Sequence, residues 1–200
     1  MARHEIAQPE GLTDGQGKAL LWLARETISR HLGVAASDPG PHAARLSDSE
    51  LQEKRGTFVT LKKNGELRGC IGSLGAVDSI VEGVKRNALH AAFEDSRFRP
   101  VEKGELAAIE VEVSILTEPR PLVYADGEEL IRALQVGSDG VIIRKGVQGA
   151  TFLPQVWEQL PRPEDFLSHL CRKGGLPADA WQSEHLDVSV YRVQYFSEHG

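Results

Sequence analysis

One short run of the sequence brings a cysteine, an arginine and two glycines together, Glu66-Leu67-Arg68-Gly69-Cys70-Ile71-Gly72. A thiolate acts as a nucleophile or a metal ligand, and a nearby cation favours the thiolate over the thiol. We therefore predict Cys70 as a catalytic nucleophile that Arg68 assists. Glycine inside a strand often marks a bulge or the close approach of a ligand or of another backbone. Gly69 and Gly72 are accordingly predicted to leave room for a ligand beside the sulfur.

The cysteine and the arginine of this run also have ordinary structural interpretations. Cysteine is among the residue types most often buried, where it behaves as a small hydrophobic residue, so Cys70 also fits a packing role. Arg68 also fits an exposed strand position with its charged group in water. The sequence leaves both alternatives open.

A β-hairpin is predicted to position the run. Asn64-Gly65 is a pair that suits a two-residue type I′ turn, because both positions take positive φ angles. Counting outward from the turn along a regular ladder, Leu61 faces Arg68 and Val59 faces Cys70. Since alternate residues share a face, the thiol and the guanidinium are predicted to lie on the same face of the ribbon.

The remaining patterns predict helices and hairpins without the regular alternation of a parallel sheet. Thr13 with Gln16, and Ser79 with Glu82, are capping-box signatures that start two of the helices. Asp139-Gly140 indicates a turn. We predict helices at 13–31, 79–93, 128–135 and 164–173, and strands at 57–62, 66–72, 109–116, 141–144, 149–153 and 186–196. The fold class is therefore α+β with a mainly antiparallel sheet flanked by helices.

Composition limits the classes of function. The 200 residues are 40% hydrophobic, which suits one globular domain or two small lobes sharing a core, predicted at 12–197 after a flexible tail at 1–11. The net charge of −6 argues against binding to nucleic acid. Only two cysteines occur, too few for a disulfide framework, and no run is long and apolar enough to span a membrane. A cytoplasmic protein is expected.

Metal and nucleotide chemistry have little support in the sequence. No two of the seven histidines lie three to five residues apart, as paired metal ligands on a helix would. The sequence also lacks a glycine-rich phosphate loop of the GxGxxG or Walker type. We predict neither a metal nor another cofactor.

The run Leu67-Arg68-Gly69-Cys70-Ile71-Gly72 resembles the signature of the AMMECR-type domain family. Further blocks in the same order agree with it, and together they cover roughly residues 12 to 197. These blocks are Asn87-Ala88, Ala91-Ala92, Asp95-Ser96-Arg97-Phe98 with Pro100, Ile109-Glu110-Val111, Thr151-Phe152-Leu153-Pro154-Gln155-Val156 and Lys173-Gly174-Gly175. The resemblance implies a two-lobed α+β domain and no settled reaction.

Residues inside the matching blocks extend the candidate site. His90 is the only histidine in such a block and is the candidate base for Cys70, although an ordinary helix-surface histidine fits as well. Candidate ligand-binding residues are Asn87, Asp95, Arg97, Thr151 and Gln155. A local turn or ion pair is the alternative for Asp95 and Arg97, and helix capping is the alternative for Thr151 and Gln155.

The resemblance also implies partner proteins. Prokaryotic members of the family resemble the A component of the AmmeMemoRadiSam set, which pairs this domain with a Memo-like protein and a radical SAM protein. Two hypotheses follow. In the first, the chain is an enzyme or enzyme component that uses Cys70 on a small-molecule substrate or a modified macromolecule. In the second, it is a binding or adaptor module that docks a partner or ligand through the Cys70 hairpin. RNA binding is a third hypothesis, against which the acidic composition argues.

Overall fold

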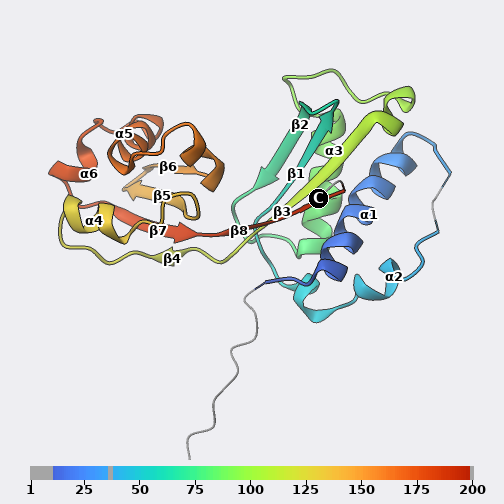
Figure 1. Ribbon diagram of the computed structural model, residues 1–200, viewed down its shortest axis with the longest axis horizontal. Coiled ribbons are helices and arrows are strands. Elements are labelled where there is room, and N and C mark those ends of the chain that lie inside the picture. The colour runs from blue at the N-terminus through green and yellow to red at the C-terminus, as the bar shows by residue number, and fades with distance from the viewer. Residues whose placement is uncertain (1–10, 36–37, 199–200) are drawn as a thin grey trace, which may run out of the picture. The chain divides into compact units, whose positions relative to one another are not determined.

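The computed structural model describes residues 11–35 and 38–198, in two compact units (Figure 1). The first unit runs to Ile115 and resumes at Gln194, and the second comprises Leu116–Val193. All but the last residue of the predicted tail at 1–11 lie outside the described residues. Each unit has its own four-stranded sheet and its own hydrophobic core. The α+β fold class is confirmed, with two sheets.

The first unit packs its helices on a sheet of order β2-β1-β3-β8. Strand β1 is antiparallel to both β2 and β3. The elements are α1 (Asp14–His31), α2 (His42–Arg45), η1 (Ser49–Gln52), β1 (Thr57–Lys63), β2 (Glu66–Ser73), α3 (Ile80–Phe93), η2 (Lys103–Ala108), β3 (Ile109–Leu116) and β8 (Val193–Ser197).

The two long helices begin where their capping residues predict. Thr13 is the N-cap of α1, and its hydroxyl accepts a hydrogen bond from the Gln16 backbone N–H at 3.3 Å. The Gln16 side chain accepts in return from the Thr13 backbone N–H at 2.9 Å, which completes the capping box. Ser79 caps α3 by accepting from the backbone N–H of Glu82. Both predicted helix starts are confirmed.

The β1–β2 hairpin has the predicted turn but a different register. Asn64 and Gly65 both have positive φ, 54° and 79°, as a type I′ turn requires. Beyond the turn a β-bulge leaves Arg68 without a partner on β1. Leu61 therefore pairs with Gly69, and Thr60 pairs with Cys70. The predicted pairs of Leu61 with Arg68 and Val59 with Cys70 are therefore wrong. A one-residue shift exchanges the two faces of a strand.

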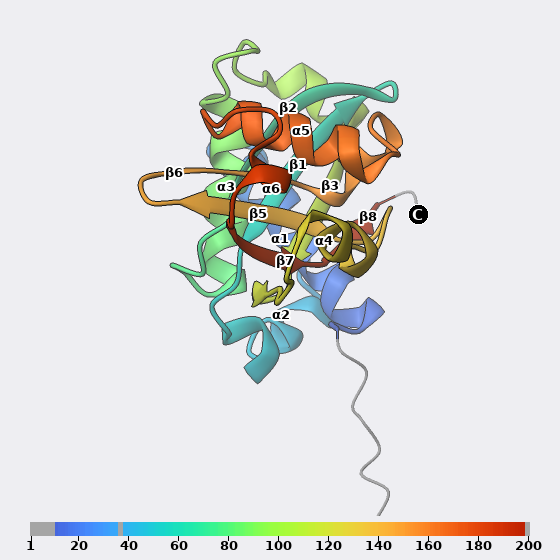
Figure 2. The same ribbon diagram turned by 90° about the vertical axis from the view of Figure 1, so that its left-hand side faces the viewer.

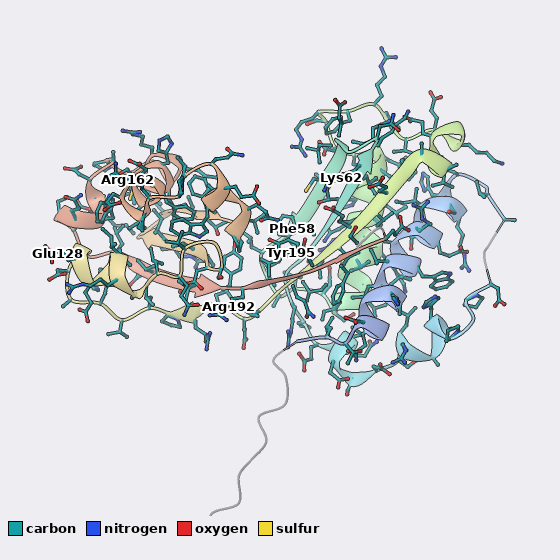
Figure 3. All side chains as sticks on the ribbon, viewed as in Figure 1. Phe58, Lys62, Glu128, Arg162, Arg192 and Tyr195 are labelled. Carbon is teal, nitrogen blue, oxygen red and sulfur yellow. The ribbon has the colours of Figure 1, made fainter. Side chains whose placement is uncertain are left out.

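That shift decides which face carries the thiol. The residues of β1 that alternate with Thr60, including Val59 and Leu61, are buried in the core with α1 and α3, which lie on one side of the sheet (Figure 1). We call the opposite side the outer face and define it by Phe58, Thr60 and Lys62 of β1 with their cross-strand partners Cys70 and Glu112. Figure 3 labels Phe58 and Lys62. The bulge thus moves Cys70 from the core face to the outer face.

The second unit has a sheet of order β4-β7-β5-β6 in which all neighbours are antiparallel. Figure 2 shows α5 in orange beside β6, and Phe166, Leu167 and Leu170 of α5 are fully buried. The elements are β4 (Arg120–Pro121), α4 (Gly127–Ala133), β5 (Gly140–Lys145), β6 (Gln148–Phe152), η3 (Pro154–Glu158), α5 (Pro163–Lys173), α6 (Ala180–Ser183) and β7 (Asp187–Tyr191).

Gly140 lies in a strand rather than in the predicted turn. It begins β5 and pairs with Tyr191 of β7, whose ring occupies the space that a Cβ at Gly140 would need. The buried Tyr191 hydroxyl is 3.0 Å from the Thr151 hydroxyl. Gly140 is therefore explained by close packing of an aromatic ring in the second unit.

The predicted closing strand at 186–196 is two strands that belong to different sheets. Strand β7 ends at Tyr191 and strand β8 begins at Val193. Between them, the Arg192 backbone N–H donates to the Thr117 hydroxyl at 2.9 Å, and the Thr117 N–H donates to the Arg192 carbonyl at 2.8 Å. No glycine or proline stands at this point, so nothing in the local sequence indicates that the chain passes from one sheet to the other.

No helix among the described residues is long and apolar enough to cross a membrane.

Candidate functional site

Cys70 is a half-buried thiol on the outer face of the first sheet. The Thr60 hydroxyl, directly across the ladder, donates a hydrogen bond to its Sγ at 3.2 Å. The other thiol, Cys171, has no exposed surface and lies in the core of the second unit. Burial raises the pKa of the Cys171 thiol, which makes it less reactive. The two cysteines therefore stand in opposite environments.

Asp95 and Arg97 hold the backbone of Cys70 from the edge of the sheet. Strand β2 is an edge strand, so one side of its backbone has no neighbouring strand in the part of the chain that the structure describes. The Asp95 carboxylate accepts from the Cys70 N–H at 2.9 Å, and Arg97 Nη2 donates to the Cys70 carbonyl at 3.1 Å. These two side chains take the place of a paired strand. We call Asp95 and Arg97 the edge clamp.

The edge clamp is itself a tight ion pair. Arg97 Nε and Nη2 donate to the two Asp95 carboxylate oxygens at 2.9 and 2.7 Å. The Asp95 side chain is only 3% exposed, whereas Arg97 is 55% exposed. Hydrogen bonds from Arg97 hold the pKa of the Asp95 carboxyl well below its usual range, and the Cys70 N–H acts in the same direction.

Arg97 is the cation that contacts Cys70, through a hydrogen bond to the backbone carbonyl. Its hydrogen bonds to Asp95 raise the pKa of Arg97, and negative charge at Cys70 adds to this effect.

Arg68 occupies the bulge without a partner on β1, so the register from which a face shared with the thiol was predicted does not hold. Arg68 Nη2 donates to Glu105 at 2.9 Å and its Nη1 donates to the Arg99 carbonyl at 2.8 Å. Lys63 also donates to Glu105, at 2.7 Å. The hydrogen bonds from Arg68 and Lys63 lower the pKa of the Glu105 carboxyl to about 2. Arg68 therefore ties β2 to the segment after α3.

At both glycines of the run, another part of the protein occupies the space that a Cβ would need. A Cβ at Gly69 would overlap with the carbonyl oxygen of Ala91 in α3. A Cβ at Gly72 would overlap with the Phe58 ring. The close approach of another backbone fits Gly69, and an aromatic ring packs at Gly72, so the ligand-binding role of both glycines stays a prediction.

Comparisons with known proteins agree with this combination of fold and motif. The sequence model of the AMMECR1 family matches residues 21–196. The chain belongs to the AMMECR1 family. Protein MK0488 of Methanopyrus kandleri is 38% identical over 198 residues, which cover 94% of this chain and 91% of that protein. Protein Mbar_A1807 of Methanosarcina barkeri is 40% identical over 189 residues, with coverages of 94% and 92%.

A solved structure resembles the AMMECR1 domain described above. It is the crystal structure of Uncharacterized Protein PH0010 from Pyrococcus horikoshii, which matches with a TM-score of 0.77 and 36% sequence identity. The match covers 94% of this chain and 93% of that chain. Both units of the AMMECR1 domain therefore belong to a fold shared with PH0010.

Two further predicted site residues of the AMMECR1 domain lie on α3. His90 is 3.6 Å from Glu94, one turn further along the same helix. Because α3 packs against the core face, His90 lies across the sheet from the Cys70 side chain. Asn87 is buried and donates to the Thr57 carbonyl and hydroxyl at 2.9 and 2.8 Å, which fastens α3 to β1. The structure thus gives Asn87 a structural contact and does not bring His90 to the thiol.

Thr151 and Gln155 belong to the second unit of the AMMECR1 domain, whereas Cys70 belongs to the first. Thr151 contacts the Tyr191 hydroxyl, and its carbonyl accepts from Lys173 at 2.9 Å. Gln155 is exposed in η3. Neither side chain caps η3. Their ligand-binding role stays a prediction.

Among the described residues, no group of three His, Cys, Asp or Glu side chains is placed to hold a metal ion. The residue that sequence reasoning missed is Thr60. It looked like one member of an ordinary β-type run, and only the bulge-shifted register brings its hydroxyl to the sulfur. An AMMECR1 signature centred on Cys70 gives no sign of a partner on the preceding strand.

Proposed function

We propose that this AMMECR1-domain protein acts through a thiol-based site at Cys70, as a component of a system with a Memo-like protein and a radical SAM protein. The observation that carries the thiol site is the placement of Cys70. Cys70 is half-buried on the outer face, its backbone is fixed by the edge clamp, and the Thr60 hydroxyl donates to its Sγ. The partners come from the family resemblance of the motif blocks.

The chemistry that this arrangement supports is attack by sulfur. Cys70 gives up its proton to water, and the Sγ lone pair forms a bond to an electrophilic atom of the substrate. The leaving group of the substrate departs with its bonding electron pair. We assign to Arg97 the supporting role that the sequence assigned to Arg68, because its guanidinium is hydrogen-bonded to the Cys70 carbonyl and a nearby cation favours the thiolate.

Alkylation of the native protein by iodoacetamide tests the thiol site. We expect Cys70 to be labelled within minutes at pH 7.5 and Cys171 to stay unlabelled, because Cys171 is fully buried and Cys70 is not. Mass spectrometry of peptides identifies the labelled residue. Cys70→Ser should abolish the native-state label and Cys171→Ser should leave it intact. Labelling of Cys70 only after the protein unfolds would contradict the proposal.

The alternative function is a binding module that docks a partner through the Cys70 hairpin. One observation favours it: Leu67, next to the bulge, is paired with Lys62 and is 44% exposed. In this alternative, Leu67→Glu abolishes binding of the Memo-like or radical SAM protein, whereas Cys70→Ser leaves it unchanged. Titration calorimetry with the purified partners measures this. Binding that survives Leu67→Glu would contradict the docking alternative.

A further inference from the structure

A row of polar side chains crosses three strands of the outer face. Thr60 on β1 lies opposite Cys70 on β2 and also opposite Glu112 on β3. Directly opposite residues of antiparallel strands place their Cβ atoms on the same face, about 5 Å apart. Lys62, two positions along β1, belongs to this face, and its Nζ is 2.5 Å from Glu112 Oε1. The thiol therefore has polar neighbours beyond the edge clamp.

Thr60 is the member of the row that contacts the sulfur. Its hydroxyl donates to Sγ at 3.2 Å. A hydrogen bond to an ionised acceptor is roughly twice as strong as one to a neutral acceptor, so this donor favours the thiolate. A β-branched side chain has a restricted χ1 angle, and β1 is paired on both sides, so the hydroxyl is held in place.

The charged groups around the thiol are paired with one another. Arg97 is paired with Asp95 beyond the edge of β2, and Lys62 is paired with Glu112 on the outer face. Glu110 lies opposite Lys62 in the next row. The two ion pairs are each neutral overall, which reduces their net effect on the sulfur. The Thr60 hydroxyl, a neutral donor in direct contact with the sulfur, therefore has the larger effect on the thiolate.

We infer that Thr60 is a positioning residue of the thiol site, whose hydroxyl holds Sγ on the outer face and stabilises its ionised form. This inference rests on the proposed function, because it assigns a second residue to the same site. Thr60 gives the site a hydrogen-bond donor on β1, the strand before the motif. Arg68 and His90 contact glutamate side chains instead of the sulfur.

Substitution at Thr60 tests the inference through the pH dependence of Cys70 alkylation. Thr60→Val keeps the shape and removes the donor, and we expect its alkylation at pH 7 to be about tenfold slower than in the wild type. At about pH 10, where a thiol is ionised with or without the donor, the two rates should converge. Thr60→Ser keeps the hydroxyl and should retain most of the wild-type rate. Rates are measured by mass spectrometry of the Cys70 peptide.

Three outcomes would overturn the role of Thr60 alone: equal rates for Thr60→Val and the wild type, a deficit that persists at pH 10, or Thr60→Ser as slow as Thr60→Val. A wild-type Cys70 that is inert until unfolding would instead overturn the thiol site itself, and the Thr60 inference with it. Circular dichroism checks that each variant folds. Thr60→Ala, which also lacks the donor, should match Thr60→Val and serves as the second variant.

Discussion

Gly69→Ala is expected to destabilise the first unit by about 3 kcal/mol, at the upper end of the usual cost of overpacking. The added methyl group would overlap with the Ala91 carbonyl oxygen of α3, and a backbone atom inside a helix does not move aside as a flexible side chain can. The helix must shift away from β2, which disturbs the contacts of Ala88 and Ala91 in the core. Urea unfolding followed by circular dichroism measures the loss.

A matched control is available at Gly104. It also lies in the first unit and has no positive φ, and a Cβ there would come within 4 Å of no atom outside its own stretch of chain. Gly104→Ala should therefore leave the free energy of unfolding unchanged or slightly higher. If both variants unfold at the same urea concentration as the wild type, the close approach of α3 to Gly69 is wrong, and so is the register that places Cys70 on the outer face.

Asp95→Ala is the second change with a large expected effect, a loss of about 2–3 kcal/mol at pH 7. It removes the acceptor for Cys70 N–H and for Arg97, and it leaves Arg97 without its carboxylate. Hydrogen exchange of the peptide that contains Cys70 should become faster, because the edge of β2 loses its clamp. Ser96→Ala, an exposed neighbour, is the control and should change neither quantity.

The pH dependence of this loss has a defined sign. The folded-state pKa of Asp95 lies below its unfolded value of about 3.9. Its contribution to stability is therefore complete above about pH 4 and disappears as the pH falls through the folded-state value. The difference between Asp95→Ala and the wild type should be smaller at pH 2.5 than at pH 7. A difference that grows in acid would contradict the ionised edge clamp.

Local signals in the sequence predicted the elements that local interactions fix. Thr13 with Gln16 satisfies backbone groups within one turn, and Asn64-Gly65 meets the backbone requirement of a two-residue turn, so both could be recognised without tertiary context. The helix starts and the hairpin followed from these signals. The glycine at position 69 was likewise recognised as a point where a ligand or another backbone comes close, and the approaching group is the backbone of α3.

The features that failed depend on contacts distant in sequence. The bulge at Arg68 is stabilised by Glu105, 37 residues away, and alternation counted from a turn assumes a ladder without bulges. The change of sheet at Arg192 depends on Thr117 in another segment. Asp95 and Arg97 were recognised through the family resemblance. Their contact with the Cys70 backbone, 25 and 27 residues away, is a tertiary interaction that no local pattern encodes.

The most direct measurement of the central claim is the rate of iodoacetamide labelling at Cys70 and at Cys171 across a series of urea concentrations below the unfolding transition. If Cys70 reacts from the native state, its rate should stay nearly constant across this range. The Cys171 rate should rise with the population of unfolded molecules, because that thiol is fully buried. If the Cys70 rate instead rises in parallel with that of Cys171, both thiols react only through unfolding, and Cys70 is not an accessible reactive group.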